Sequence, residues 1–199
     1  LGEIFGSIEQ CLDRFAGLPG KGEPWRQLRC FLSEDFLPEL EAARQWSEDQ
    51  GRILWDMPLA AEQKTLSPSD FGFHNAVRRR DGQIVFLDFE YFGWDDPAKM
   101  VSDFLLHPAM PLREEHRRRF VGSLLDRFED DGRLARRIEV AYPLFGLKWC
   151  LILLNEFLPD QLERRRFAGE TSVDTAGVQA GQLLKARDML ERVMKEHER

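Results

Sequence analysis

The chain has 199 residues, which is within the usual size range of one domain. With 43% hydrophobic and 32% charged residues, it has the composition of an ordinary globular protein and not of a disordered or fibrous one. Its net charge of −7 argues against nucleic acid as a partner, because proteins that bind nucleic acid usually carry a basic excess.

Apolar periodicity predicts three helices in the first part of the chain. The first covers residues 1–16, the second 23–36 and the third 38–50. Residues 67–75 have no clear periodicity and are expected to form a loop.

A hairpin is predicted next. Residues 76–78 read as a short strand, and the β-branched, apolar residues 84–87 read as a second one. Asp81-Gly82 between them is a strong signal for a tight turn. Residues 93–97 are expected to form another loop.

The rest of the chain is predicted to be helical, with prolines and glycines between the helices. His107, which precedes Pro108, is expected to lie at a helix end. The predicted helices cover residues 98–106, 112–130, 134–157 and 171–198.

These elements predict an α+β fold that is mainly helical, in a single domain over residues 1–199. A helical part (1–66) precedes the loops and the hairpin (67–97), and a second helical part (98–199) follows.

The cysteines bear on the compartment. Cys11, Cys30 and Cys150 form no C-x-x-C pair, and so sparse and odd a set argues against a disulfide framework. Cysteines that stay reduced are typical of the cytoplasm, so a cytoplasmic protein is predicted. Cys150 lies in an apolar stretch and is expected to be a core residue. The apolar run at 151–154 is too short to span a bilayer and no signal peptide is visible, so no membrane partner is expected.

The residues that carry chemistry lie on both sides of the hairpin. Asp70 and Asn75 form a D-x-x-x-x-N motif, and Asp88-Phe89-Glu90 follows the second strand, in the order of the kinase signature. Phosphoryl transfer needs these residue types. A loop carboxylate accepts the proton of the attacking hydroxyl, while an Asn amide oxygen and a second carboxylate are hard ligands for Mg²⁺. The hairpin is expected to hold the two groups together, so that catalysis is mostly positioning and charge neutralisation.

This arrangement resembles the aminoglycoside phosphotransferases and the related choline and homoserine kinases. These carry H-G-D-x-x-x-x-N, a hairpin of similar length, I-D-F-E or I-D-W-E, and then G-x-x-D-P. The similarity covers residues 66 to about 103 and rests on Asp70, Asn75, Asp88-Phe89-Glu90, Gly93 and Asp96-Pro97.

The resemblance implies a carboxy-terminal lobe of the protein-kinase-like fold, with the hairpin carrying the catalytic and metal-binding loops. It implies that Asp70 is the catalytic base or orients the hydroxyl, and that Asn75 and Asp88 are the Mg²⁺ ligands through which the co-substrate ATP is bound.

Three further residues are candidates for contact with the substrate or support of the loop: His74, Glu90 and Asp96. His74 is favoured as a loop-packing residue, because Asp70 already fills the role of the base. Asp96, with Asp95, is also a candidate cap of the next helix.

The sequence departs from the family pattern in two places, the H-G-D element and the acidic residue after D-P. Pro68 stands where the family has the His of H-G-D, and Ser69 stands where it has the Gly. The support that this His gives the loop must come from elsewhere, and Ser67 and His74 are candidates. The acidic residue that the family carries shortly after D-P has its nearest candidate in Asp103.

A kinase-like enzyme also needs a Gly-rich loop over the phosphates and a strand lysine, and neither is found before Asp70. We therefore expect the amino-terminal lobe to be missing, this chain to be a piece of the full enzyme, and the piece alone to be inactive.

The expected function of the parent protein is ATP- and Mg²⁺-dependent transfer of a phosphoryl group to a hydroxyl of a small molecule. The alternative is a degenerate kinase-like lobe that binds a ligand or a partner. Pro68 and the missing lobe favour the alternative. The joint presence of Asp70, Asn75 and Asp88 opposes it, because a binding module has no need of that set.

Overall fold

The computed structural model of the protein describes residues 2–51, 58–161 and 174–197. These residues are mainly helical, with two small antiparallel strand pairs, which confirms the coarse prediction of a mainly helical α+β fold. Contacts divide the chain into two compact units. We call Leu1–Arg52 with Gly146–Arg199 the helical unit, and Ile53–Phe145 the hairpin unit. The expected single domain stays a prediction.

The helical unit contains the predicted helices from both ends of the chain. The prediction for residues 171–198 is confirmed from Thr175 onward, and residues 171–173 and 198 lie outside the described residues. The elements of this unit are α1 (Gly2–Asp13), α2 (Glu23–Cys30), η1 (Phe31–Phe36), α3 (Leu37–Gly51), the second part of α6 (Leu134–Leu153), η4 (Leu154–Phe157) and α8 (Thr175–His197).

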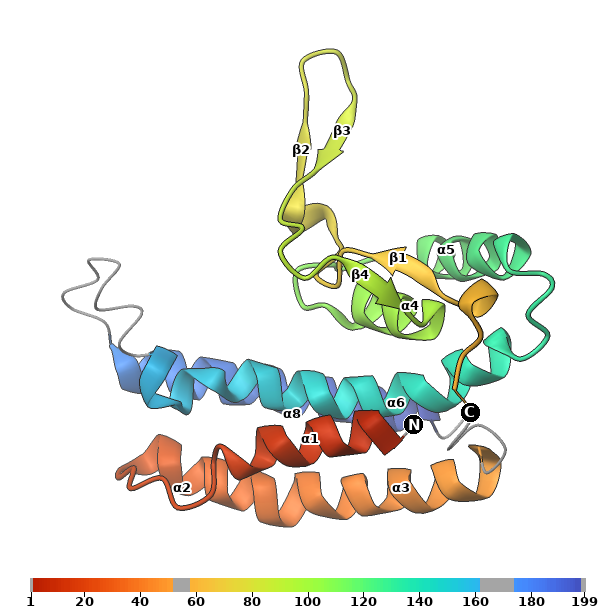
Figure 1. The fold of residues 1–199 in the computed structure, drawn as a ribbon. Coiled ribbons are helices and arrows are strands. Elements are labelled where there is room, and N and C mark those ends of the chain that lie inside the picture. The colour runs from red at the N-terminus through yellow and green to blue at the C-terminus, as the bar shows by residue number, and fades with distance from the viewer. Residues whose placement is uncertain (1, 52–57, 162–173, 198–199) are drawn as a thin grey trace. The chain divides into compact units, whose positions relative to one another are not determined.

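One helix replaces two predicted ones. The chain runs from α2 through the π-helical segment η1 into α3, drawn as a continuous orange ribbon in Figure 1. Pro38 caused the wrong prediction of a break, because a proline has no N–H to donate to the preceding turn. In the π turn the N–H of Leu37 reaches back five residues, to the carbonyl of Leu32. This wider turn takes up the irregularity just before the proline, so the helix continues.

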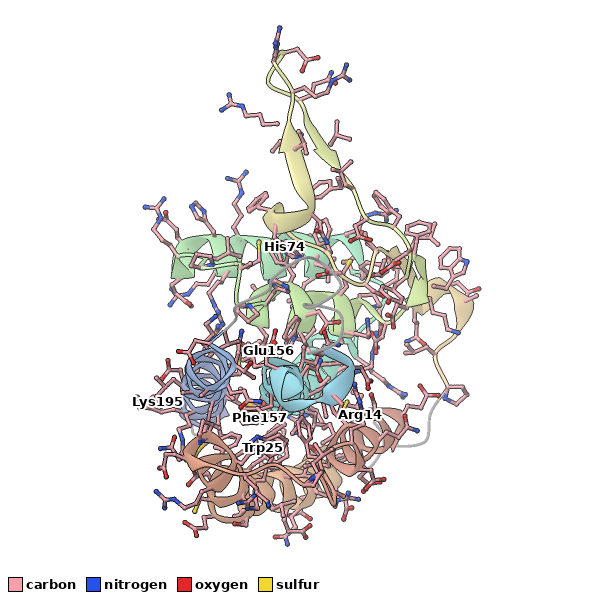
Figure 2. All side chains as sticks on the ribbon, turned by 90° about the vertical axis from the view of Figure 1, so that its left-hand side faces the viewer. Arg14, Trp25, His74, Glu156, Phe157 and Lys195 are labelled. Atoms are coloured by element: carbon pink, nitrogen blue, oxygen red, sulfur yellow. The ribbon has the colours of Figure 1, made fainter. Side chains whose placement is uncertain are left out.

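Aromatic and small residues build the core of the helical unit. The rings of Trp25 and Phe157 meet edge to face, with centroids 5.3 Å apart (Figure 2). At Gly146 the helices α6 and α8 approach so closely that a Cβ would lie 2.2 Å from Cγ2 of Val193. Cys150 is fully buried, which confirms it as a core residue, and burial raises the pKa of its thiol.

The segment Leu134–Phe157, which contains the apolar run at 151–154, is long and apolar enough to cross a membrane by length and composition alone. Apolar runs in the sequence end at charged residues such as Lys148, whereas the helix continues through them. In the most apolar 18-residue stretch of this segment, 56% is buried inside the protein. The core helix of a soluble protein can be as long and as apolar. The expectation of no membrane partner stays a prediction.

The hairpin unit holds all the described strands, two whole α-helices, two short 3₁₀ segments and the start of α6. Its elements are η2 (Ala61–Gln63), β1 (Thr65–Ser67), η3 (Phe73–Asn75), β2 (Ala76–Arg78), β3 (Ile84–Phe86), β4 (Gly93–Asp95), α4 (Pro97–Leu106), α5 (Glu114–Arg127) and the first part of α6.

The predicted hairpin is confirmed. β2 pairs antiparallel with β3, with Ala76 opposite Phe86, and the pair projects from its unit in Figure 1. Gly82 in the turn has a φ of 86°, which glycine adopts without steric cost. The N–H of Arg79 donates to the carbonyl of Gln83 at 2.8 Å and closes the turn.

The predicted loop over 93–97 was wrong for its first three residues. Gly93–Asp95 forms β4, which pairs antiparallel with β1, Thr65 lying opposite Asp95. Three residues are too few to display an alternating pattern, and the partner strand lies far back in the sequence. This pairing ties the start of the loop that carries Asp70 to the end of the segment that carries Asp88.

The core of the hairpin unit anchors the same loop. Val101, Phe104, Leu105 and Met110 form a buried cluster. Phe71, directly after Asp70, stacks on Phe104 with centroids 5.2 Å apart and packs against Phe86 of β3 at 5.0 Å. The residue beside Asp70 is therefore fixed both to the helix α4 and to the hairpin.

Candidate functional site

The loop that presents Asp70 is tightly turned. Ser67, 1% exposed, accepts a hydrogen bond through Oγ from the N–H of Ser69 at 3.1 Å. Ser69 has a φ of 63°, in the left-handed region that favours glycine, and its hydroxyl donates to the carbonyl of Tyr91 at 3.2 Å. Ser67 thus supports the loop backbone, as one of the two candidates proposed from sequence.

The carboxylate of Asp70 is held by two side chains of its own loop. Nε2 of His74 lies 2.8 Å from Oδ1. The amide nitrogen of Asn75 donates to Oδ2 at 3.1 Å and to the backbone carbonyl of Asp70 at 3.0 Å. The side chain of Asp70 is still 44% exposed, so a ligand can reach it. Figure 2 shows His74 at the foot of the hairpin.

A third residue, from α4, reaches the same carboxylate. His107 ends α4, as predicted, and its Nε2 lies 3.6 Å from Oδ1 of Asp70. Its ring stacks on that of His74, with centroids 3.9 Å apart and an interplanar angle of 4°. No feature of the sequence points to this contact, because His107 is separated from Asp70 by the hairpin and a whole helix.

The protonation of His107 follows from its surroundings. The N–H of Ala109 donates to Nδ1 at 3.1 Å, so the neutral ring carries its proton on Nε2, which faces Asp70. Burial lowers the pKa of His107, the neighbouring His74 lowers it further, and the carboxylate of Asp70 raises it in part. The net direction is down, which favours the neutral ring.

Asp70, His74 and His107 together offer three ligand atoms within 4.8 Å of one another. The stacking nevertheless prevents both rings from binding one ion. An imidazole binds a metal in its own plane, with a Zn–N distance of about 2.0–2.1 Å. An ion shared by two parallel rings whose centroids are 3.9 Å apart would lie far out of both planes, where neither ring has a lone pair. The arrangement suits proton holding better than metal binding.

The hairpin joins the backbone of Asn75 to Leu87, the residue before Asp88. The N–H of Leu87 donates to the carbonyl of Asn75 at 2.8 Å, so Asp88 follows directly on a residue bonded to Asn75. Asp88 has a φ of 61°, which Asp tolerates better than most residues. Since the amide nitrogen of Asn75 is used on Asp70, its oxygen is left as the side chain's acceptor. This oxygen and the Asp88 carboxylate are of the hard type that Mg²⁺ takes.

Asp88 and Glu90 have exposed side chains. Within the described residues, no hydrogen bond or ion pair holds either carboxylate. Glu90 lies in the turn between β3 and β4, apart from the contacts around Asp70.

Asp96 has a structural task. Its Oδ1 accepts from the N–H of Ala98 at 2.9 Å and caps α4, which confirms the predicted cap. Nε of Arg137, a side chain 9% exposed, lies 3.1 Å from its Oδ2. This use of both oxygens supports the loop and helix and leaves little of the carboxylate for a substrate.

Asp103, the nearest candidate for the displaced acidic residue, faces a lysine. Nζ of Lys99 lies 3.1 Å from Oδ2 of Asp103 and 2.8 Å from Oδ2 of Asp95. Burial lowers the pKa of Lys99, but the two carboxylates outweigh it and the net direction is up. The charged lysine therefore links Asp95, just before α4, to Asp103 within the helix.

Large apolar side chains surround the loops and cover the hairpin without being buried. Tyr91 and Trp94 are each 68% exposed, and an exposed apolar surface of this extent usually marks a place of contact. The exposed members are Leu66, Phe73, Val77, Ile84, Val85, Leu87, Phe89, Tyr91, Phe92 and Trp94.

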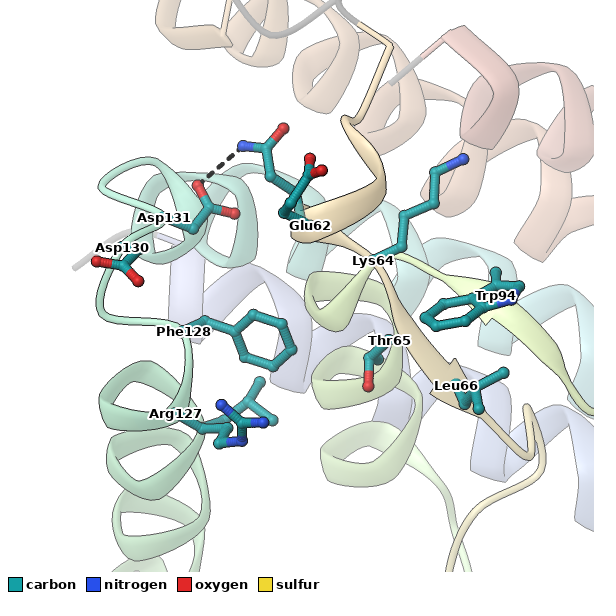
Figure 3. Close-up of a pocket in the computed structure, with 11 residues that line it drawn as sticks. Glu62, Lys64, Thr65, Leu66, Trp94, Arg127, Phe128, Asp130 and Asp131 are labelled. Atoms are coloured by element: carbon teal, nitrogen blue, oxygen red, sulfur yellow. Dashed lines mark hydrogen bonds between the residues drawn. The ribbon is translucent and has the colours of Figure 1, made fainter.

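A pocket of about 580 Å³ lies elsewhere in the hairpin unit (Figure 3). Trp94 and Phe128 form apolar parts of its wall, Lys64 and Arg127 are its cations, and Gln63 donates to Asp131 at 3.1 Å across one side. None of the residues predicted from sequence for the site lines it, so it contributes nothing to the chemistry around Asp70.

Comparison with known proteins adds no family. No protein-family model matches the chain, and no curated protein matches it at a significant level.

Proposed function

We propose that the hairpin unit carries the catalytic and metal-binding loops of a kinase-like small-molecule phosphotransferase, similar to the aminoglycoside phosphotransferases. The parent protein would use ATP and Mg²⁺ to phosphorylate a hydroxyl group, in the cytoplasm.

One observation carries this proposal. Asn75 joins the two halves of the motif. Its side-chain nitrogen donates to Asp70, and its backbone carbonyl accepts from the N–H of Leu87, the residue before Asp88. The carboxylate of Asp70 and the segment that carries Asp88 are thus both bonded to one residue, Asn75, the first through its side chain and the second through its backbone. Phosphoryl transfer needs this combination of groups at close range.

Each residue then has a role. Asp70 accepts a hydrogen bond from the substrate hydroxyl, orients its oxygen towards the terminal phosphorus of ATP and receives the proton. The new O–P bond forms as the bond between that phosphorus and the bridging oxygen breaks, which leaves ADP and a phosphate monoester. Asn75 and Asp88 would hold Mg²⁺, which neutralises charge on the phosphates.

The exposed apolar surface supports the same reading. The base of ATP and an amino-terminal lobe that packed on this unit would both need apolar contacts. Side chains such as Val77, Val85 and Leu87 offer them here.

The same surface also favours the second candidate, a kinase-like lobe that only binds a partner or ligand. Pro68, which has no N–H and no polar side chain where the family has its His, favours it as well. The two candidates differ in whether nucleotide binding depends on the metal and on Asp88.

The test uses the full-length protein that contains this chain. Mg²⁺-ATP binding is measured by calorimetry and ATP hydrolysis by release of phosphate, for wild type, Asp70→Asn and Asp88→Asn. Asp126→Asn, on the exposed side of α5, is the matched control.

We expect Asp88→Asn to weaken Mg²⁺-ATP binding, because a metal ligand loses its charge. Asp70→Asn should keep binding and lose about 10²–10⁴-fold in turnover, the usual contribution of a general base. Binding that is independent of metal and equal in all four proteins would leave the partner-binding lobe as the function.

A further inference from the structure

We propose that His107 is a positioning residue for Asp70, stacked on His74 and fixing the direction of the carboxylate towards the substrate hydroxyl. This inference rests on the function proposed above and concerns how the same site is held in place.

The orientation of the His107 ring is fixed from both sides. Its Nδ1 accepts from the backbone N–H of Ala109 at 3.1 Å, which puts the proton on Nε2. Nε2 lies 3.6 Å from Oδ1 of Asp70, and the side chain of His107 is 16% exposed. A separation of 3.6 Å is long for a hydrogen bond, and such contacts in free enzymes tighten when the substrate binds.

The stacking with His74 adds a second constraint. The two rings lie parallel at 3.9 Å, and both Nε2 atoms approach the same oxygen of Asp70. Rotation of one ring would break the stack as well as its contact with Oδ1. The pair therefore brackets one side of the carboxylate, while Asn75 occupies Oδ2 on the other.

The neighbours of Asp70 limit the directions from which a substrate hydroxyl can reach its carboxylate. A carboxylate offers about four lone-pair directions. His74, Asn75 and His107 face three of them, which leaves one direction for the hydroxyl. A base with a single open direction positions its substrate more narrowly than a freely rotating carboxylate does.

The position of Pro68 explains why the loop needs such help. The family pattern has a His there, and a proline side chain has no polar group to offer. Two imidazoles that reach the aspartate from other positions, one in the loop and one at the end of α4, take over the support.

The test compares two substitutions that each keep half of the His107 contacts. His107→Gln places an amide nitrogen near the position of Nε2 and keeps a donor towards Asp70. His107→Asn places an oxygen near the position of Nδ1, keeps the acceptor for Ala109 and loses the donor. His116→Gln, on the exposed surface of α5, is the control.

In the full-length protein we expect His107→Asn to lower the kcat of ATP hydrolysis by at least tenfold, with a change in KM for Mg²⁺-ATP of less than about threefold. His107→Gln should retain most of kcat, and His116→Gln all of it. Thermal unfolding of each variant separates loss of turnover from loss of fold.

Two outcomes would overturn the inference. The first is a folded His107→Asn variant that turns over as fast as wild type, while the Asp70→Asn variant is inactive. This result would leave the proposed function intact. If Asp70→Asn is as active as wild type, the proposed function itself fails. The other is independent of turnover: ring ¹⁵N shifts that assign the proton of neutral His107 to Nδ1 instead of Nε2.

Discussion

Two guanidinium nitrogens of Arg137 donate hydrogen bonds to the carboxylate of Asp96. Its Nε lies 3.1 Å from Oδ2 and its Nη2 lies 3.2 Å from Oδ1. The same guanidinium reaches Oδ2 of Asp131 at 2.8 Å through Nη2. Since Asp96 also caps α4, one buried cation holds the start of the helix whose last turn leads to His107. The base of α6 and the site around Asp70 are therefore linked through α4.

We expect Arg137→Met to lower the free energy of unfolding by about 3 kcal/mol, because the buried side chain of Asp131 loses its counter-charge and the partly exposed Asp96 loses its partner. Arg136→Met is the matched control one residue away. Arg136 pairs with Glu139 on the surface of the same helix, and a pair of that kind contributes about 0.3–0.5 kcal/mol. Urea unfolding of both variants measures the difference. Equal losses would mean that the charge of Arg137 is not needed in the interior.

Acid should weaken the same network. Burial raises the pKa of Asp131, but hydrogen bonds and charge from Arg137, with a hydrogen bond from Gln63, outweigh it and set the pKa below its ordinary value. The unfolded chain then binds the proton first, so the stabilisation is present above the ordinary carboxyl pKa of about 4 and is lost as the pH falls through the lower folded value.

Asp131→Asn tests this sign. The variant should be less stable than wild type at pH 7, and the gap should shrink as the pH is lowered below about 4. Urea unfolding at a series of pH values gives both curves. A gap that widened on acidification would contradict the lowered pKa.

Features that depend on neighbouring residues could be predicted from the sequence, whereas features that depend on distant residues were missed. The hairpin was predictable because its signals are local: β-branched residues at 84 and 85, and Gly82 in the turn. The cap at Asp96 was predictable for the same reason, since Pro97 follows it.

The missed features depend on distant partners. β4 exists because β1 pairs with it, and His107 joins the site because α4 places its end beside Asp70. The π turn before Pro38 is a response to a missing hydrogen bond that single-residue preferences do not encode. The residue types of the site and the two loop supports Ser67 and His74 were thus predictable from sequence, whereas the contact from His107 was not.

Ser69 stores strain in the loop. A residue with a Cβ in the left-handed region costs about 1–2 kcal/mol, and Ser69 offsets part of this through its bond to the carbonyl of Tyr91. Ser69→Gly removes both the strain and the bond, so thermal unfolding should shift little. Ser69→Val keeps the strain, adds a β-branched side chain and loses the bond, and should destabilise by about 2 kcal/mol or more. Greater damage from glycine than from valine would refute a left-handed Ser69.

Two helical glycines should respond in opposite directions to the same substitution. Gly146 faces α8, where a Cβ would lie 2.2 Å from Cγ2 of Val193, and that valine is 4% exposed and has little room to move. Gly122 in α5 has nothing within 4 Å of its Cβ position. Gly146→Ala should destabilise by about 1–3 kcal/mol through overpacking, whereas Gly122→Ala should stabilise by about 1 kcal/mol through helix propensity.

Urea unfolding distinguishes the two glycine variants by sign, and a third protein identifies the cause. Gly146→Ala combined with Val193→Ala removes the clashing methyl groups, so the double variant should lose less than the sum of the single losses. Simple additivity would mean that α6 and α8 do not meet at this glycine, and the close approach of the two helices would then have to be rejected.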